Sequence, residues 1–413
     1  MINKFSPKSL KIVAFFAALG IASTIFFDTF EAHDTGGQEK VERVFEDRVK
    51  VKGWVSGYLK NSEMTREFSV LDPDEGTLQV KLTLKEDMQA EAEKLLKRYK
   101  PDFGAIFMMD AKTGKVLALA SFEKEPELGS NLNFLASFPA ASIFKVITAA
   151  AATDKAGLEP DHKIYFNGGN YTLYKKNVLS DKINRWTRVI TLKDAFARSI
   201  NTAFGRLSLQ NLEPNDLKQY AERFYFNRAI PSDFAVESGT ANVPDIKGYE
   251  LTEVASGFTR SNTMSPVQGA MIAAAIANGG LMVAPYIVDQ VTNSEGKMIY
   301  KGEALQVGQS VSNESAEKIR ELMGNTVLAG TSRRTFKTLV KDKKFKTYEF
   351  GGKTGHLTGE KPKGRVDWFV GYTIDGDQKL AIAALTVNRK FWTVKSSYLG
   401  QHMFRAHLES DTY

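Results

Sequence analysis

The sequence predicts an α+β protein whose antiparallel sheet combines strands from distant parts of the chain. Two strand–turn–strand patterns support this, residues 104–121 with a turn at Thr113-Gly114 and residues 367–387 with a turn at Asp375-Gly376. The chain between them, from about residue 139 to 330, has mostly helical patterns. Strands at both ends with helices inserted between them are typical of the α+β class.

The remaining elements complete this picture. Residues 85–99 have the apolar spacing of an amphipathic helix, and residues 348–355 resemble a strand. Alternating polar and apolar residues from Val49 to Leu84 predict short strands and a small β-rich pedestal. The expected helices after the first hairpin include residues 194–208, 265–280, 315–328 and, at the end of the chain, 395–408.

The N-terminus has the composition of a membrane anchor or an export signal. Lys4, Lys8 and Lys11 precede a charge-free run from Ile12 to Phe27. Sixteen helical residues span ~24 Å, a little less than the ~30 Å hydrocarbon core of a bilayer. Because Lys11 can snorkel to the head groups, we expect residues 10–27 to form an uncleaved single-pass anchor in the cytoplasmic membrane. A cleaved signal and a buried helix remain alternatives. Lysines before the run place the rest of the chain on the outer, periplasmic or extracytoplasmic side.

We therefore expect three regions. Residues 1–30 form a cytoplasmic tip and the anchor or signal, residues 31–79 a charged linker and the pedestal, and residues 80–413 the main α+β domain. The chain has 413 residues, a net charge of +7 and no cysteine, which excludes thiol catalysis, cysteine zinc sites and disulfides. The mild positive charge fits an anionic wall polymer, lipid head groups or solvated surface, and no feature indicates a nucleic-acid partner.

Three other kinds of site lack their motifs. The run "FGGKTG" resembles the end of a phosphate-binding loop, but that motif needs glycine where Thr347 stands. No G-x-S-x-G elbow is present, so an α/β-hydrolase triad is not indicated. The five histidines show no metal-ligand spacing, and we expect neither a metal nor a cofactor.

A serine and a lysine within an apolar helix form the first candidate pair. Ser142 and Lys145 are three residues apart, so on a helix their side chains share one face. Serine needs a base to become a nucleophile, and burial lowers the pKa of a lysine until part of it is neutral amine. The pattern S-x-x-K is weak alone, because Ser315 and Lys318 repeat it in a charged segment, and a snorkelling lysine is the alternative.

The order of three motifs strengthens this interpretation. Ser199-Ile200-Asn201 follows Ser142, and Lys353-Thr354-Gly355 follows in a strand-like run after two glycines. A second K-T-G at residues 112–114 precedes Ser142 in a hairpin turn, where a structural role is expected. The series S-x-x-K, S-x-N, K-T-G resembles the penicillin-binding protein transpeptidases and the serine β-lactamases that share their fold. The resemblance covers residues 80 to about 408.

The resemblance implies a fold and a set of roles. The fold is an antiparallel sheet flanked by helices plus an all-helical lobe. Ser142 would attack the penultimate D-alanine carbonyl of a peptidoglycan stem peptide while Lys145 takes its proton. Ser199 would relay a proton to the leaving D-alanine, Asn201 would hold a substrate amide, and Lys353 with Thr354 would hold the substrate carboxylate. The N–H groups of Ser142 and of His356, which follows Gly355, would form the oxyanion hole.

Two positions depart from the family pattern. The residue before the nucleophile is usually glycine and is Ala141 here, and a hydroxyl residue usually follows K-T-G where His356 stands. His356 is expected either to donate a hydrogen bond to the substrate carboxylate or to be a plain strand residue. Thr358 is the alternative hydroxyl.

Together these observations predict a membrane-anchored peptidoglycan D,D-transpeptidase that β-lactam antibiotics acylate at Ser142. A D,D-carboxypeptidase or endopeptidase, a β-lactamase, and a catalytically weak β-lactam-binding scaffold protein of the wall-synthesis complex remain alternatives on the same site. The residues before position 80 are too few for a glycosyltransferase domain, which leaves a separate glycosyltransferase partner open.

Overall fold

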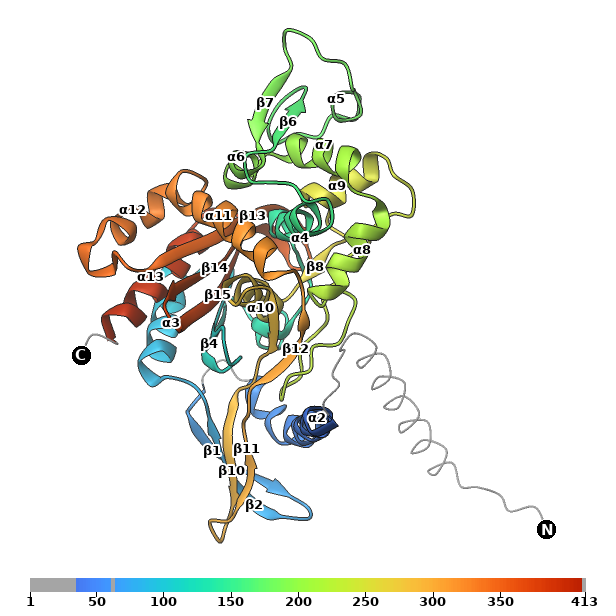
Figure 1. The fold of residues 1–413 in the computed structure, drawn as a ribbon. Helices are drawn as coiled ribbons and strands as arrows, with labels where there is room; N and C mark the ends of the chain where they lie inside the picture. The colour runs from blue at the N-terminus through green and yellow to red at the C-terminus, as the bar shows by residue number, and fades with distance from the viewer. Residues whose placement is uncertain (1–34, 61–63, 411–413) are drawn as a thin grey trace, which may run out of the picture. The chain divides into compact units, whose positions relative to one another are not determined.

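The structure, a computed structural model, describes residues 35–60 and 64–410 (Figure 1). The anchor expected over residues 10–27 lies outside these described ranges. Within them, no helix combines the length and the apolar character needed to cross a bilayer. The chain divides into two compact units, residues 1–46 and residues 47–413, and the second unit contains the fold described below.

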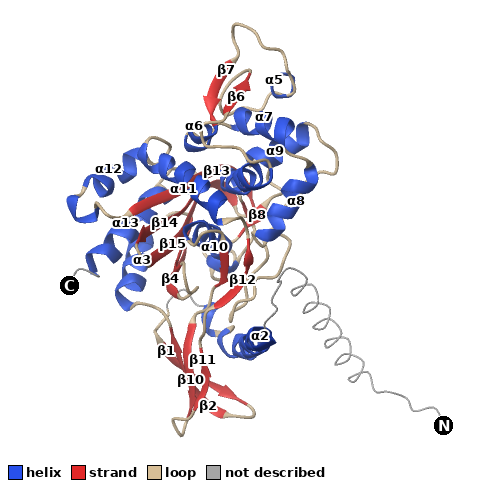
Figure 2. Cartoon of the chain, viewed as in Figure 1, coloured by secondary structure: helices blue, strands red, loops and turns tan. Residues whose placement is uncertain are grey.

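A five-stranded antiparallel sheet forms the centre of the second unit (Figure 2). Its order is β13 (Glu349–Glu360), β14 (Lys363–Asp375), β15 (Gln378–Asn388), β3 (Phe103–Asp110) and β4 (Val116–Glu123). Both predicted hairpins are confirmed, and β15 pairs with β3 to join the late hairpin to the early one. The predicted sheet built from distant segments is therefore present.

Helices cover both faces of this sheet. On one face, α3 (Glu86–Tyr99), α12 (Arg333–Lys341) and α13 (Ser396–Ser410) share a hydrophobic core with the sheet. On the other face, α10 (Pro266–Ala277) packs against β14, β15 and β3. All twelve residues of α10 are buried, which explains why its sequence is apolar on every side.

The predicted helical region forms a second lobe beside β13. It consists of η3 (Ala141–Ile143), α4 (Phe144–Ala150), the π-helical η4 (Ala151–Lys155), α6 (Leu192–Ala197), α7 (Asn201–Asn211), α8 (Pro214–Arg223), α9 (Tyr249–Ser256) and α11 (Asn313–Leu328). A small projection between η4 and α6 contains β6 (Lys163–Phe166), α5 (Lys175–Val178) and β7 (Arg188–Thr191).

A separate four-stranded sheet corresponds to part of the predicted pedestal. Its order is β1 (Glu67–Asp72), β2 (Gly76–Leu82), β10 (Val288–Asn293) and β11 (Met298–Lys301). Strands β10 and β11 come from far along the chain, and their pairing with residues 67–82 was not predicted from the sequence. The smaller elements are η1 (Tyr58–Lys60), η2 (Leu132–Phe134), β5 (Phe138–Pro139), β8 (Thr263–Met264), β9 (Leu281–Ala284), β12 (Leu305–Gln309) and η5 (Lys343–Phe345).

The expected strand that begins at Val49 is wrong, because residues Thr35–Val55 form helix α2. The alternation of valine and lysine suggested a strand, but the buried residues Arg48, Val51 and Val55 recur at helical spacing. The buried Arg48 guanidinium donates hydrogen bonds to the backbone carbonyls of Pro231 and Pro285 at 2.9 and 3.3 Å. These contacts within the second unit favour the helix over the locally plausible strand.

Candidate active site

Ser142 lies at the start of a helix that is held against the edge of the central sheet. Strand β5 leads into η3 and then α4, and the indole of Trp368 in β14 donates a hydrogen bond to the Pro139 carbonyl at 2.9 Å. Ala141 has a φ of +49°, in the left-handed region that favours glycine. Ser142 is partly exposed at the resulting turn, whereas the residues of α4 that follow are buried. The backbone therefore presents the hydroxyl of Ser142 to solvent and keeps α4 in the core.

Lys145 is completely buried and contacts three oxygen atoms. Its Nζ lies 2.9 Å from Ser142 Oγ, 2.7 Å from Asn201 Oδ1 and 2.5 Å from the backbone carbonyl of Ser256. The amide nitrogen of Asn201 donates to the Tyr171 carbonyl at 2.7 Å, which turns Oδ1 toward the lysine. The amide oxygen and the carbonyl only accept hydrogen bonds, whereas a hydroxyl can also donate one.

This contact set accommodates a charged ammonium, which can donate to all three oxygens, and also a neutral amine. A neutral Nζ has two N–H groups, which can donate hydrogen bonds to Asn201 Oδ1 and to the Ser256 carbonyl. Its one lone pair can accept a hydrogen bond from the hydroxyl of Ser142. Burial lowers the pKa of Lys145 well below its usual 10.5, and a charged Lys353 nearby lowers this pKa further. The arrangement therefore suits a base that accepts the proton of Ser142.

Ser199 and Lys353 form a second hydrogen-bonded pair. Ser199 lies in the break between α6 and α7, where its φ is +55°. Thr191 caps the start of α6, where its side chain accepts a hydrogen bond from the Asp194 N–H. Lys353 in β13 is fully buried, and its Nζ donates to Ser199 Oγ at 3.0 Å. Burial lowers the pKa of Lys353 to about 7. Both protonation states are therefore populated at neutral pH, which suits a proton relay.

The other K-T-G residues lie along the same strand. Thr354 is partly exposed, and its Oγ1 lies 2.6 Å from Oγ1 of Thr331. Gly355 is buried against Ile143, where an added Cβ would approach the Ile143 side chain to 3.1 Å. His356 is two residues from Thr354, so both side chains lie on the same face of β13.

His356 is exposed and touches an aromatic neighbour. Its ring packs edge-on against Trp392, with the ring centroids 5.2 Å apart. Desolvation and the nearby Lys395 and Arg365 cations lower the pKa of His356 below its usual 6.5. The imidazole is therefore mostly neutral at neutral pH.

The structure connects most of the predicted site residues directly. Ser142, Lys145 and Asn201 form one hydrogen-bonded group, Ser199 and Lys353 form another, and Thr354, Gly355 and His356 continue along β13. Sequence reasoning missed Ser256, Tyr171 and Thr331. The first two act through backbone carbonyls, which carry no sequence signal, and Thr331 is recognisable only by its position beside Thr354.

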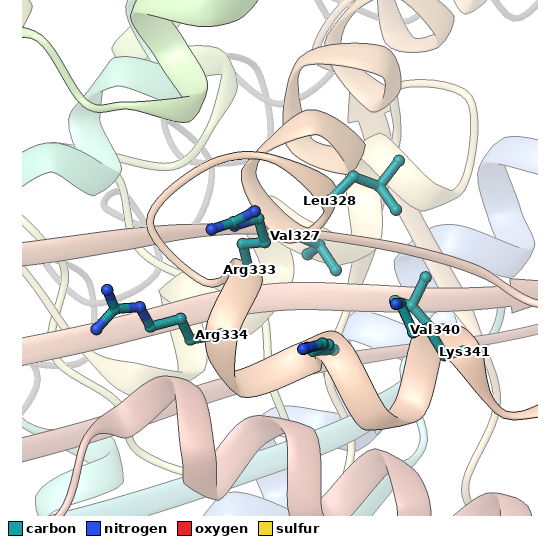
Figure 3. Close-up of a pocket in the computed structure, with 7 residues that line it drawn as sticks. Val327, Leu328, Arg333, Arg334, Val340 and Lys341 are labelled. Carbon is teal, nitrogen blue, oxygen red and sulfur yellow. The ribbon is translucent and has the colours of Figure 1, made fainter.

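A cavity of about 400 Å³ lies elsewhere, between the end of α11 and α12 (Figure 3). It is lined by three apolar side chains and four cations, which are Val327, Leu328, Val340, Arg333, Arg334, Lys337 and Lys341. None of the predicted site residues lines it, and we do not assign it to the reaction.

Comparisons with known proteins identify the family of the chain. The family model described as the penicillin binding protein transpeptidase domain matches residues 104–409. The chain is 25% identical to stage V sporulation protein D of Bacillus subtilis over 87% of this chain and 58% of the relative. It is 26% identical to the peptidoglycan D,D-transpeptidase PbpA of Mycobacterium tuberculosis over 70% of this chain and 63% of the relative. The chain thus spans about three fifths of the length of these relatives.

Solved structures share the fold. The imipenem acyl-enzyme complex of penicillin-binding protein A from M. tuberculosis matches with a TM-score of 0.65 at 23% identity, over 80% of this chain and 79% of that one. The D,D-transpeptidase domain of a peptidoglycan glycosyltransferase from Eggerthella lenta also matches with a TM-score of 0.65 at 23% identity, over 83% of this chain and 89% of that one. Because the family model matches well over half of the chain, this protein belongs to the penicillin-binding protein transpeptidase family.

Proposed function

We propose that this chain is a peptidoglycan D,D-transpeptidase with Ser142 as its nucleophile. The observation that carries the proposal is the contact set of Lys145, in which only the hydroxyl of Ser142 can donate to the amine. The names of the relatives support the reaction class, since one is a peptidoglycan D,D-transpeptidase and another is known as an acyl-enzyme with a β-lactam.

The reaction begins when Ser142 Oγ attacks the carbonyl of the penultimate D-alanine and Lys145 Nζ accepts its proton. The oxygen of the tetrahedral intermediate is stabilised by the backbone N–H groups of Ser142 and His356. The peptide bond to the terminal D-alanine then breaks, and Ser199 passes a proton to the departing amine with Lys353 beside it. This leaves the shortened stem peptide as an ester on Ser142.

The second half of the reaction reverses these proton transfers. An amine from a neighbouring stem peptide attacks the ester carbonyl and loses a proton to the relay, and Ser142 Oγ regains a proton as it leaves. Asn201 holds a substrate amide, while Lys353, Thr354 and the Gly355–His356 backbone line the place of the substrate carboxylate. The product is a peptide crosslink between two stem peptides, and β-lactams imitate the D-alanyl-D-alanine end.

We further propose that the protein is anchored in the cytoplasmic membrane through residues 10–27, with the catalytic domain on the outer side. Residues 1–30 form the tip and anchor, 31–79 the linker and pedestal, and 80–413 the transpeptidase domain. The charge-free run after Lys11 supports this arrangement. A separate glycosyltransferase would supply the glycan strands that the enzyme crosslinks.

A labelled penicillin tests the proposed nucleophile. We expect covalent labelling of the wild-type protein that persists for many minutes, loss of labelling in Ser142→Ala, and unchanged labelling in Ser315→Ala, which removes the serine of the other S-x-x-K. Labelling is measured on denatured protein and located by mass spectrometry of peptides. Labelling of Ser142→Ala at the wild-type rate would contradict the assignment, and release of label within seconds would identify a β-lactamase instead.

A further inference from the structure

The projection formed by residues 163–191, here called the hairpin segment, exposes an unusual amount of apolar surface. Fourteen large hydrophobic residues are exposed in the part of the chain that the structure describes, and seven of them lie in this segment. They are Tyr165, Tyr171, Tyr174, Leu179, Ile183, Trp186 and Val189. Ile183 and Trp186 are 74% and 73% exposed. Such clusters on a soluble surface commonly mark an interaction site.

The hairpin segment is also strongly basic. Its cations are Lys163, Lys175, Lys176, Lys182, Arg185 and Arg188, all of them exposed, and its single acidic residue, Asp181, pairs with Arg206 of α7. Within the described residues, none of the six cations forms an ion pair with a carboxylate. Three of them instead lie over aromatic rings, Lys175 at 5.8 Å from Tyr249, Arg185 at 4.7 Å from Trp186 and Arg188 at 5.0 Å from Phe166. This surface therefore suits a partner that is anionic and also offers faces for aromatic rings.

The segment is fastened to the helix that carries the S-x-N motif. Asn201 donates to the Tyr171 carbonyl at 2.7 Å, and the next residue, Thr202, donates from its hydroxyl to the Gly169 carbonyl at 2.6 Å. One turn later, Arg206 donates to the Val178 carbonyl at 3.0 Å. These three contacts fix the hairpin segment to α7, the helix that begins with the candidate site residue Asn201.

We propose that the hairpin segment binds the glycan strand that carries the stem peptide to Ser142. This inference rests on the proposed function. The exposed rings of Trp186 and the tyrosines pack against the apolar faces of sugar rings, and the cations pair with the carboxylates of the peptides along the strand. Tyrosine and tryptophan give large contact area at low cost in side-chain entropy.

The hairpin segment projects from one end of the second unit (Figure 1). In Figures 1 and 2 it lies at the opposite end of the second unit from the four-stranded sheet of β1, β2, β10 and β11. The last turns of α2 belong to the sheet end, where the Trp54 indole donates to Asp72 of β1 at 2.6 Å.

Binding to purified insoluble peptidoglycan tests the proposal. The full-length protein carries Ser142→Ala, so that retention reports binding without acyl transfer. We expect the double variant Arg185→Glu/Trp186→Ala to lose at least tenfold in affinity by cosedimentation. A matched double variant on the α12 cavity, Leu328→Ala/Lys337→Glu, also truncates one exposed apolar side chain and reverses one charge, and should bind as the parent does.

A second measurement separates this proposal from the proposed function. With Ser142 restored, all variants should react with labelled penicillin within about twofold of the wild-type rate, which also shows that they are folded. With polymeric glycan strands as substrate, KM should rise at least fivefold in Arg185→Glu/Trp186→Ala, while kcat/KM for a short D-alanyl-D-alanine peptide stays unchanged. Failure of penicillin labelling in the wild type would overturn the function, whereas failure of peptidoglycan binding would overturn only the glycan surface.

Two further outcomes would overturn the proposal. One is parental affinity for peptidoglycan in both Arg185→Glu/Trp186→Ala and a second variant of the segment, Tyr165→Ala/Lys182→Glu. The other is that the wild-type protein binds anionic lipid vesicles, and that these variants lose vesicle binding but keep their affinity for peptidoglycan. That result would assign the segment to a membrane surface.

Discussion

The chain contains two Ser-x-x-Lys pairs on helices, and their lysines have opposite environments. Lys145 of the first pair is fully buried, and its pKa falls well below the usual value because the charged form loses its hydration. Lys318 of the second pair lies beside Glu159 and Glu314 at 2.7 and 2.8 Å, and these carboxylates raise its pKa. The same four-residue pattern thus gives a lysine with a lowered pKa in one place and a lysine with a raised pKa in the other.

The two K-T-G copies differ in the same way. Lys112 lies in the turn between β3 and β4 and pairs with exposed Asp377 at 3.1 Å. Lys353 lies inside β13 and contacts Ser199. In the first copy, the Thr113 hydroxyl donates a hydrogen bond to Asp110 and Gly114 adopts a φ of +82°. This tripeptide therefore forms a turn. Burial and the neighbouring element, more than the motif itself, decide whether these residues can do chemistry.

Replacing each S-x-x-K lysine in turn by arginine should show the largest difference between the two pairs. Arginine stays charged at every accessible pH, so it cannot accept the proton of Ser142. We expect Lys145→Arg to lower the second-order rate of penicillin acylation by about 10³-fold or more, because the activated nucleophile is lost. Lys318→Arg should leave this rate within about twofold, and both are measured with a fluorescent penicillin. Equal rates in the two variants would show that Lys145 is not the base.

The two K-T-G lysines should differ in the pH dependence of acylation. If Lys353 must be protonated to hold the substrate carboxylate, acylation of the wild type falls as the pH rises through about 7, where the buried ammonium loses its proton. Lys353→Arg keeps its charge, so we expect a rate about 10- to 100-fold lower but no fall near pH 7. Lys112→Arg should retain the wild-type profile. Persistence of the fall in Lys353→Arg would assign it to another group.

A smaller effect is expected at His356. If the protonated imidazole assists carboxylate binding, the ratio of acylation rates between the wild type and His356→Thr should increase as the pH falls below 6.5. The increase begins below the usual histidine pKa because desolvation, Lys395 and Arg365 disfavour the charged ring. Protonation of Lys145 in acid lowers the acylation rates of both proteins, so it cancels when the ratio of the two rates is taken. A ratio that stays constant from pH 8.5 to 5.5 would leave His356 as a strand residue beside Trp392.

The smallest effect concerns the turn before Ser142. Ala141 has a left-handed φ, which costs a residue with a Cβ ~1–2 kcal/mol. Glycine avoids this strain, but the greater entropy of its unfolded chain lowers the free energy of unfolding by ~0.4–1 kcal/mol. Ala141→Gly should therefore raise the free energy of unfolding by up to about 1 kcal/mol and leave acylation within about threefold. The control Ala140→Gly, at a φ of −62°, should lower the free energy of unfolding. Stabilisation by both substitutions in urea unfolding would show that strain at Ala141 is not the cause.

The sequence alone predicts the α+β class, both hairpins of the central sheet and the buried helix α10. These elements are set by local turn residues and by the period of the apolar positions, which act within one segment. It also identified Ser142, Lys145, Ser199, Asn201 and Lys353, because three motifs in a fixed order are far more specific than any one of them. Their catalytic roles remain predictions.

Tertiary packing determines which copy of each motif is buried. It also decided that Val49–Val55 continue helix α2, where contacts from Arg48 to Pro231 and Pro285 outweigh a strand-like alternation. The partners of Lys145 include a carbonyl at Ser256, more than a hundred residues away, and any residue type supplies such a carbonyl. Desolvation of Lys145 and Lys353 likewise arises from surrounding elements, so their lowered pKa values are properties of the folded chain that a local pattern does not contain.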